Sequence, residues 1–173
     1  MKSLALKISM AVLSMIPLVA KAELIVLASP QSNDAYYAKM IDDIFDFHVD
    51  YAKKIIKNGD NVVVLTDKGL YPDYVKALGK KHVAIAPMHD IWMRDFSSAN
   101  PAQPVMFRYT AAGQGGAKKG QTISDEVQDE FKYYSQKAGL QFTQSKLLND
   151  GGNWVENGYG NLVLSTKFLA DNK

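Results

Sequence analysis

The sequence predicts an α/β or α+β fold, because two kinds of segment are mixed along one chain. Short apolar runs bounded by Gly, Pro or polar residues are typical of buried strands. Two longer segments repeat apolar residues every three to four positions, as amphipathic helices do. The 173 residues are 47% hydrophobic and 22% charged. This length can bury one core, and the composition argues against a disordered chain, a collagen-like repeat or a coiled-coil rod.

The first 22 residues have the features of a secretory signal peptide. Lys2 and Lys7 precede an apolar run over 8–20, and Ala20-Lys21-Ala22 fits the small-x-small cleavage pattern. The run is short for a membrane span, and an uncleaved N-terminal anchor is the alternative. We therefore expect cleavage before Glu23, a domain over 23–173, and a secreted or periplasmic protein without a stable membrane anchor after cleavage.

Charge and cysteine content narrow the classes of function. The chain has 20 Lys and Arg against 18 Asp and Glu, and three of the lysines lie in the predicted signal peptide. The mature chain then has 17 basic and 18 acidic residues, a net charge of −1. This charge gives no support for nucleic acid or an anionic membrane as a partner. The absence of cysteine excludes disulfides, thiolate metal sites and a cysteine nucleophile within these residues. No motif implies a metal or an organic cofactor.

The first half of the mature chain is predicted to alternate strands and helices. Asn58-Gly59, Gly79 and Pro87 supply the endings of these elements. The expected elements are a strand over 24–28, an amphipathic helix over 35–57, a strand over 61–66, a short helix over 72–78 and a strand over 83–86.

The second half begins after a loop predicted over 88–104. Gly139 ends a long helix, and Asn157-Gly158 between two apolar runs is a strong hairpin signal. The halves look alike, so an internal structural repeat is a further expectation. The expected elements are a strand over 105–110, a flexible loop over 111–120, a helix over 124–138, a strand over 140–148, and hairpin arms at 154–156 and 162–166.

Residues 89–95 are the first segment whose side chains do not follow the apolar pattern. This segment, His-Asp-Ile-Trp-Met-Arg-Asp, follows a predicted strand, and α/β folds bind ligands at the carboxyl ends of strands. A carboxylate can receive a planar guanidinium through two N–H···O bonds while an aromatic ring stacks on the same cation. Trp92 and Asp95 would therefore suit a flat cationic ligand. The alternative is that Trp92 is buried and Arg94 pairs with Asp90 or Asp95.

Residues 149–154 are the second such segment. Gly151 and Gly152 allow positive φ and a close approach of the backbone to a ligand, and Asp150 lies beside them. The alternative is an ordinary tight turn before the hairpin. Of the three histidines, His48 is expected to be buried and hydrogen-bonded and His82 to be exposed. His89 adjoins the Asp–Trp cluster and is a candidate for a supporting role, with no role in the site as the alternative.

Together, the two segments resemble a known enzyme family. Asp90-x-Trp92-x-Arg94-Asp95 is followed about 55 residues later by Asp150-Gly151-Gly152-Asn153, and then by Asn157-Gly158-x-Gly160-x-Leu162-x-Leu164-Ser165-Thr166. In this order and at this spacing, the motifs are similar to those of the bacterial-type peptidyl-arginine deiminases and agmatine deiminases. The resemblance covers nearly the whole mature chain, but only about the N-terminal half of a typical family member.

The resemblance implies a pentein fold, a five-bladed α/β propeller of ββαβ units, of which this chain would form a part. It implies hydrolysis of a guanidinium group to a ureido group with release of ammonia, on peptidyl-arginine or on agmatine in the route to putrescine. Asp95 matches the guanidinium-binding carboxylate, Trp92 the aromatic residue on the substrate, and Asp150 the acidic position of the second motif. The candidate catalytic residues are Asp95 and Asp150, and the candidate substrate-binding residues are Asp90, Trp92, Arg94, Asp95, Gly151, Gly152 and Asn153.

The chain also departs from the family pattern. The resemblance places a His-x-Asp pair after the hairpin and a cysteine nucleophile near the C-terminus. Neither is found there in this sequence, and Phe96-Ser97-Ser98 replaces the usual Gly-Pro after Asp95. One hypothesis is a deiminase represented by its N-terminal portion, for example through a gene fragment, and inactive alone. The alternative is a secreted non-catalytic module that binds guanidinium compounds or arginine-containing peptides. A half-propeller leaves sheet edges and apolar surfaces uncovered, so we expect self-association or a missing C-terminal half. Agmatine, free arginine and peptidyl-arginine stay open as substrates.

Overall fold

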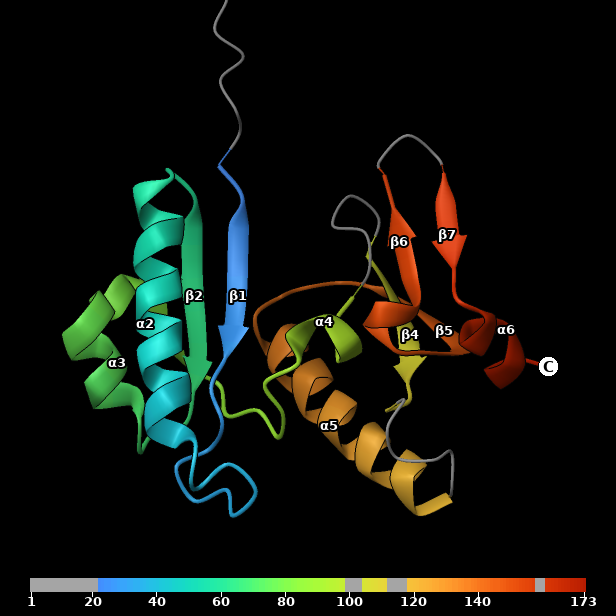
Figure 1. Cartoon of the computed structure of the whole chain (residues 1–173), viewed down its shortest axis with the longest axis horizontal. Helices are drawn as coiled ribbons and strands as arrows, with labels where there is room; N and C mark the ends of the chain where they lie inside the picture. Colours follow the sequence, from blue (N-terminus) through green and yellow to red (C-terminus); the bar gives the residue numbers. More distant parts are fainter. Residues whose placement is uncertain (1–21, 99–103, 112–117, 158–160) are drawn as a thin grey trace, which may run out of the picture.

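The computed structural model describes residues 22–98, 104–111, 118–157 and 161–173, and it has a mixed α/β fold, which confirms the predicted class (Figure 1). The strands form three separate sheets, and no closed sheet is present among the described residues. The strands are β1 (Leu24–Ala28), β2 (Asn61–Thr66) and β3 (Val83–Ile85) in the first sheet, β4 (Val105–Tyr109) and β5 (Thr143–Asn149) in the second, and β6 (Trp154–Glu156) and β7 (Leu162–Leu164) in the third. The helices are α2 (Ile41–Lys57), α3 (Tyr71–Leu78), α4 (Met93–Phe96), α5 (Lys118–Lys137) and α6 (Thr166–Asp171), with 3-10 turns η2 (Lys80–His82) and η4 (Gly151–Asn153).

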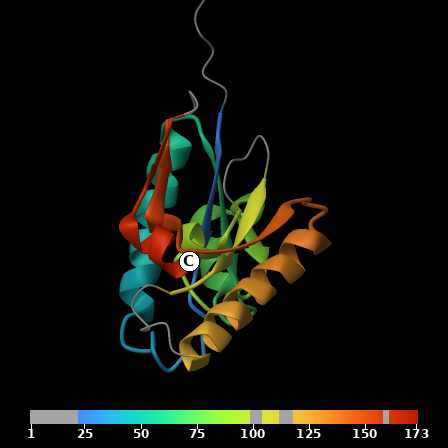
Figure 2. The same cartoon turned by 90° about the vertical axis from the view of Figure 1, so that its right-hand side faces the viewer.

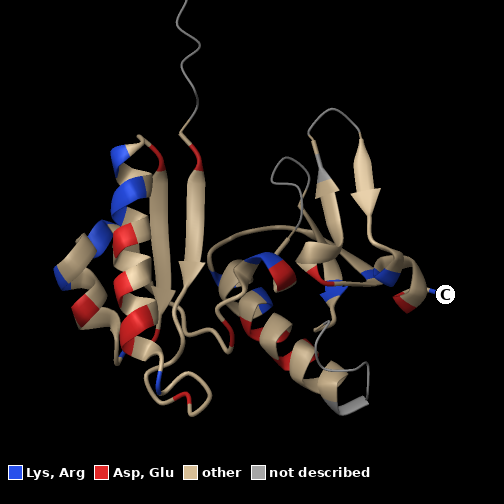
Figure 3. Ribbon diagram, viewed as in Figure 1, with Lys and Arg blue, Asp and Glu red and all other residues tan. Residues whose placement is uncertain are grey.

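The first sheet is parallel, in the order β1-β2-β3, with α2 and α3 as its connections. Figure 1 shows both helices on the same side of the strands. Alternate residues of β2 are buried on that side, where Val62 and Val64 contact apolar residues of α2 and α3. Burial of this apolar surface fixes the sheet against the two helices. On α2, acidic residues lie in the first turn and basic residues in the last, which suits the helix dipole (Figure 3).

The second sheet pairs β4 and β5 in parallel, and α5 connects them. Figure 2 shows α5 beside β4. The largest core cluster lies here and also includes the last residue of β1 and residues that follow β3, so it joins the two sheets. Its members are Ala28, Ala86, Met88, Phe96, Met106, Tyr109, Val127 and Phe131. Both sheets thus contain a strand–helix–strand unit, as the predicted internal repeat requires. Within the described residues, neither sheet has the ββαβ order that the resemblance implies.

The helix α4 lies inside the segment predicted to be a loop over 88–104. It is a single turn, closed by hydrogen bonds from the Asp95 amide to the Trp92 carbonyl (2.8 Å) and from the Ser97 amide to the Met93 carbonyl (3.0 Å). Phe96 anchors it by full burial in the core. Four residues are too few to show a helical repeat, which is why the sequence did not reveal this element.

Other boundaries differ from the prediction for local reasons. The helix expected over 35–57 begins at Ile41, because residues 35–40 form turns before it. The helix expected from Ser124 begins at Lys118, within the segment predicted to be a flexible loop, whose residues 112–117 lie outside the described part. The three glycines predicted to end helices, Gly59, Gly79 and Gly139, have φ of 92°, 87° and 79°. Only glycine adopts this left-handed backbone readily, so these endings are confirmed.

The third sheet is the predicted hairpin. β6 and β7 are antiparallel, with Val155 opposite Val163. The turn at 158–160 lies outside the described residues. The second arm ends before Ser165, whose hydroxyl accepts the Phe168 amide (3.2 Å) and caps α6.

The predicted signal peptide lies almost wholly outside the described residues, which begin at Ala22. Within the described part of the chain, no helix is both long enough and apolar enough to cross a membrane.

Candidate functional site

One cavity of about 650 Å³ opens at the carboxyl ends of four strands, two from each of the two parallel sheets. Residues that follow β1, β3 and β5 line it, together with the end of β4 and the first turns of α5. Carboxyl ends of parallel strands share one edge of each sheet. The core cluster common to both sheets holds the two edges together, so segments far apart in the sequence meet here. The lining residues are Asp34, Tyr36, Tyr37, His89, Asp90, Trp92, Asp95, Tyr109, Ala111, Ile123, Ser124, Glu126, Val127 and Asp150.

Asp95 is half-buried at this cavity, and other acids surround it. Burial is the main reason why the pKa of Asp95 rises to about 6, and the negative charges of Asp150 and Asp90 add to the rise. A hydrogen bond with Asp150 acts in the same direction, while the positive charge of Arg94 opposes it. A bound cation favours the ionised carboxylate, so the site is electrostatically suited to a positive ligand.

Asp150 and Asp90 are each held by nearby donors. Asp150 follows β5 and caps η4, where its Oδ1 accepts the Gly152 amide at 2.9 Å. Asp90 Oδ1 accepts the Tyr37 hydroxyl at 2.8 Å and the Ile91 amide at 2.7 Å. The structure therefore brings Asp90, Asp95 and Asp150 to one cavity, as the two motifs predicted.

Trp92 lines the same cavity and is 60% exposed, so the alternative of a simply buried indole is wrong. Its ring offers a face on which a planar cation can stack, in the cavity that it shares with Asp90, Asp95 and Asp150.

Four of the predicted substrate-binding residues do not line the cavity. Arg94 donates from Nε to the Gly151 carbonyl (3.2 Å) and from Nη2 to the Trp154 carbonyl (3.4 Å), and it forms no ion pair with Asp90 or Asp95 in the described structure. Asn153 accepts the Ser165 hydroxyl at 2.8 Å, which joins η4 to the end of β7. Arg94 and Asn153 thus tie the hairpin to the site rather than face a ligand.

The two glycines also have a different role from the one predicted. Neither Gly151 nor Gly152 has a positive φ. A Cβ at Gly151 would overlap the carbonyl oxygen of Arg94, so the close approach is to this backbone and not to a ligand. At Gly152 the nearest atom to such a Cβ is Asp150 Oδ1, at 3.4 Å, which is ordinary contact.

The histidines divide into three cases. His48 is buried with Nδ1 3.0 Å from the Tyr74 hydroxyl, as predicted, and burial lowers its pKa to about 4. The expectation that His82 is exposed is wrong, because it is buried with Nδ1 3.0 Å from the Val62 carbonyl. His89 lines the cavity, and its Nε2 lies 3.7 Å from Glu130 Oε2. A supporting role for His89 stays a prediction.

Sequence reasoning missed several residues of the cavity, among them Tyr37, Tyr109 and Glu126. Tyr37 follows the first strand and Tyr109 ends the fourth, so the rule that ligands bind at strand ends could have found both. Glu126 lies on a helix whose acidic residues all look alike in the sequence, and only the fold shows that it faces the cavity.

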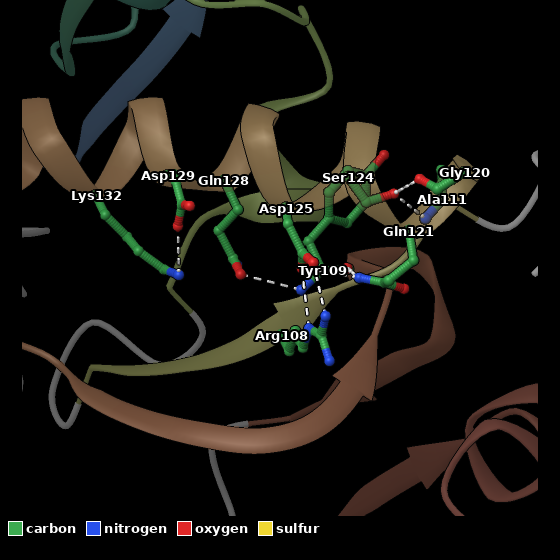
Figure 4. Close-up of polar contacts among 10 residues, drawn as sticks. All are labelled: Arg108, Tyr109, Ala111, Gly120, Gln121, Ser124, Asp125, Gln128, Asp129 and Lys132. Atoms are coloured by element: carbon green, nitrogen blue, oxygen red, sulfur yellow. Dashed lines mark hydrogen bonds and ion pairs between the residues drawn. The ribbon is translucent and has the colours of Figure 1, made fainter. Parts of the chain in front are cut away.

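Gln128, on α5, makes three side-chain hydrogen bonds next to the cavity, and Figure 4 shows the one with Tyr109. Its Oε1 accepts the Tyr109 amide (3.1 Å), and its Nε2 donates to the carbonyls of Phe107 (2.7 Å) and Phe96 (3.1 Å). One buried amide thus connects α5, β4 and α4, the helix that carries Asp95. On the same helix, the Asp125 carboxylate accepts two hydrogen bonds from the Arg108 guanidinium, from Nε at 2.9 Å and from Nη2 at 2.6 Å. This guanidinium is therefore already paired.

The described lining residues include five carboxylates and no Lys or Arg. This arrangement can bind a cation through oxygen acceptors and one aromatic face. Among the residues that the structure describes, no group of three or more His, Asp or Glu side chains could hold a metal ion.

Known proteins that resemble this chain are deiminases. A family model described as Porphyromonas-type peptidyl-arginine deiminase matches residues 14–173. A search of curated proteins found no match.

Solved structures resemble the chain in fold. Agmatine deiminase of C. jejuni superimposes with a TM-score of 0.63 at 17% identity, over 88% of this chain and 46% of that one. A Cys-to-Ser variant of C. jejuni agmatine deiminase with substrate bound gives 0.62 at 16%, over 84% and 43%. Agmatine deiminase of Enterococcus faecalis gives 0.56 at 15%, over 83% and 40%. The chain therefore spans less than half the length of these structures.

Proposed function

Because the chain belongs to the Porphyromonas-type peptidyl-arginine deiminase family, we propose that it forms the guanidinium-binding part of a deiminase. The observation that carries this proposal is the meeting of Asp90, Asp95, Asp150 and Trp92 at one cavity. A guanidinium is flat and permanently charged, so carboxylates at its edge and an indole on its face complement it. Agmatine or peptidyl-arginine would supply such a group.

The proposed reaction of the whole deiminase adds water to the guanidinium carbon and releases ammonia, which leaves a ureido group. Asp95 and Asp150 would hold the cation so that its carbon stays in reach of a nucleophile. This chain contains no cysteine, so a thiolate nucleophile would come from residues beyond this sequence. The same residues would complete the propeller. With agmatine as substrate, the product would lead toward putrescine.

A second function is supported by the same absence of cysteine. A non-catalytic module would keep the binding half of the site and bind guanidinium compounds or arginine-containing peptides without turnover. The nucleotide sequence downstream of this chain distinguishes the two functions. A deiminase requires a cysteine and a His-x-Asp pair encoded there, in frame or after one frameshift. In either case we propose export of the chain after cleavage before Glu23, which the mass of the mature protein would test.

Calorimetric titration of the purified chain with agmatine tests the binding. We expect measurable heat with the unaltered protein and loss of binding in Asp95→Asn, because the carboxylate charge is removed. Asp129→Asn is the matched control, since Asp129 is an exposed acid on α5 that pairs with Lys132 and does not line the cavity. No heat at millimolar agmatine would contradict the proposal. Ureido-group formation by this chain alone would contradict the assignment of the nucleophile to other residues.

A further inference from the structure

Tyr37 lines the cavity and makes a hydrogen bond to Asp90 that the proposed function does not use. Its side chain is 7% exposed, and its hydroxyl donates to Asp90 Oδ1 at 2.8 Å. Tyr37 follows β1 while Asp90 follows β3, so this bond joins two loops that are 53 residues apart.

The loop that carries Tyr37 is itself fixed. Asp34 Oδ1 accepts the amides of Tyr36 (2.7 Å) and Tyr37 (3.4 Å), which sets the turn before α2. Gln31 donates from Nε2 to the Met88 carbonyl at 3.4 Å, two residues before Asp90. The hydroxyl of Tyr37 therefore approaches Asp90 from a loop whose position is already determined.

Asp90 has one occupied oxygen and one open oxygen. Its Oδ1 accepts both Tyr37 and the Ile91 amide, whereas no described residue donates a hydrogen bond to its Oδ2. The negative charge of Asp90 lies close enough to Asp95 to affect its ionisation. Like charges repel, so an untethered Asp90 carboxylate would turn away from the other acids.

We infer that Tyr37 is a positioning residue, which holds Asp90 in the cavity so that its open oxygen accepts a second hydrogen bond from a guanidinium bound at Asp95. The inference rests on the proposed function, and it adds the residue that keeps a third carboxylate in place against repulsion. Tyr37 itself does not contact the ligand.

A double-mutant cycle tests the inference, with agmatine as the probe and calorimetry as the measurement. We expect Tyr37→Phe to weaken agmatine binding about three- to tenfold, the usual effect of one lost hydrogen bond. In an Asp90→Ala background, Tyr37→Phe should cause no further loss, because Tyr37 acts through Asp90. Tyr74→Phe is the matched control, since it removes a buried hydroxyl that pairs with His48 away from the cavity.

Three results would overturn the inference where the unaltered protein binds agmatine. These are unchanged affinity in Tyr37→Phe, additive losses in the double mutant, or an equal loss in Tyr74→Phe. If the unaltered protein does not bind agmatine, the proposed function fails. The positioning role of Tyr37 is then tested by the carbon-13 resonance of the Asp90 carboxyl in the ligand-free protein. A shift of this resonance in Tyr37→Phe but not in Tyr74→Phe supports the positioning role, and no shift in either overturns it.

Discussion

At the scale of single residues, the proton on Asp95 connects ligand binding to pH. Burial and neighbouring acids raise the pKa of Asp95 to about 6, so the carboxyl is largely ionised at pH 7 and largely protonated at pH 5. A cation binds the ionised form better. Binding below pH 6 must therefore release a proton.

We expect the affinity for agmatine to fall about tenfold between pH 7 and pH 5, since one unit below the pKa leaves about a tenth of the carboxylate. Titrations at both pH values, in buffers of different ionisation enthalpy, measure the affinity and the released proton. An affinity that stays constant over this range would contradict the assignment of the proton to the ligand site.

The same residue makes a prediction about stability. The folded-state pKa lies above the ordinary value of 3.8, so between about pH 4 and pH 6 the folded state binds more protons than the unfolded state. Stability from this group is present at low pH and is lost as the pH rises through 6. We expect Asp95→Asn to raise the melting temperature by about 2–4 °C at pH 7.5 and to leave it unchanged at pH 4. An equal gain at both pH values would show that the substitution acts through packing.

At the scale of elements, the contact of η4 with α4 depends on one missing Cβ. Gly151 leaves room for the Arg94 carbonyl, and Arg94 donates back to the Gly151 carbonyl. We expect Gly151→Ala to destabilise the fold by about 1–3 kcal/mol, because backbone atoms must move apart. Gly152→Ala is the control and should change stability by less than about 0.5 kcal/mol. Urea unfolding of both variants measures the difference, and equal effects would contradict this view of the turn.

Predictability from the sequence also varied between elements. The positive-φ glycines end helices where the sequence placed them, because the cause is local. The meeting of Asp90, Asp95 and Asp150 was predictable because strand ends converge in α/β folds. The burial of His82 and the side-chain bonds of Arg94 were not, because both depend on carbonyls from distant segments, Val62 and Trp154. Tertiary contacts of this kind leave no periodic signal in the chain.

At the scale of the whole molecule, the apolar surface that the described residues leave open includes a cavity and a hairpin. A cavity of about 740 Å³ lies between the first sheet and α5, with Val26, Leu65 and Phe131 among its lining residues. The β6–β7 hairpin exposes Val155, Leu162 and Val163, the last by 71%. Exposed apolar patches on a small protein promote association.

We therefore expect the chain to self-associate at high concentration. Val163→Lys should reduce this association, because a charge in the patch opposes apolar contact. Gln136→Lys is the control, since it adds the same charge at an exposed polar position of α5. Sedimentation velocity over a concentration series measures the effect. A strictly monomeric chain, or equal behaviour of both variants, would contradict the role of the hairpin.

The Gln128 side chain has a consequence for motion. Its amide links the Tyr109 N–H to the Phe96 and Phe107 carbonyls, so loosening any of these strands or helices removes bonds from the others. Segments connected in this way tend to open together. Deuterium uptake at the amide of Tyr109 should then occur at the same rate as uptake at the amide of Ser97, because both would belong to one cooperative opening unit.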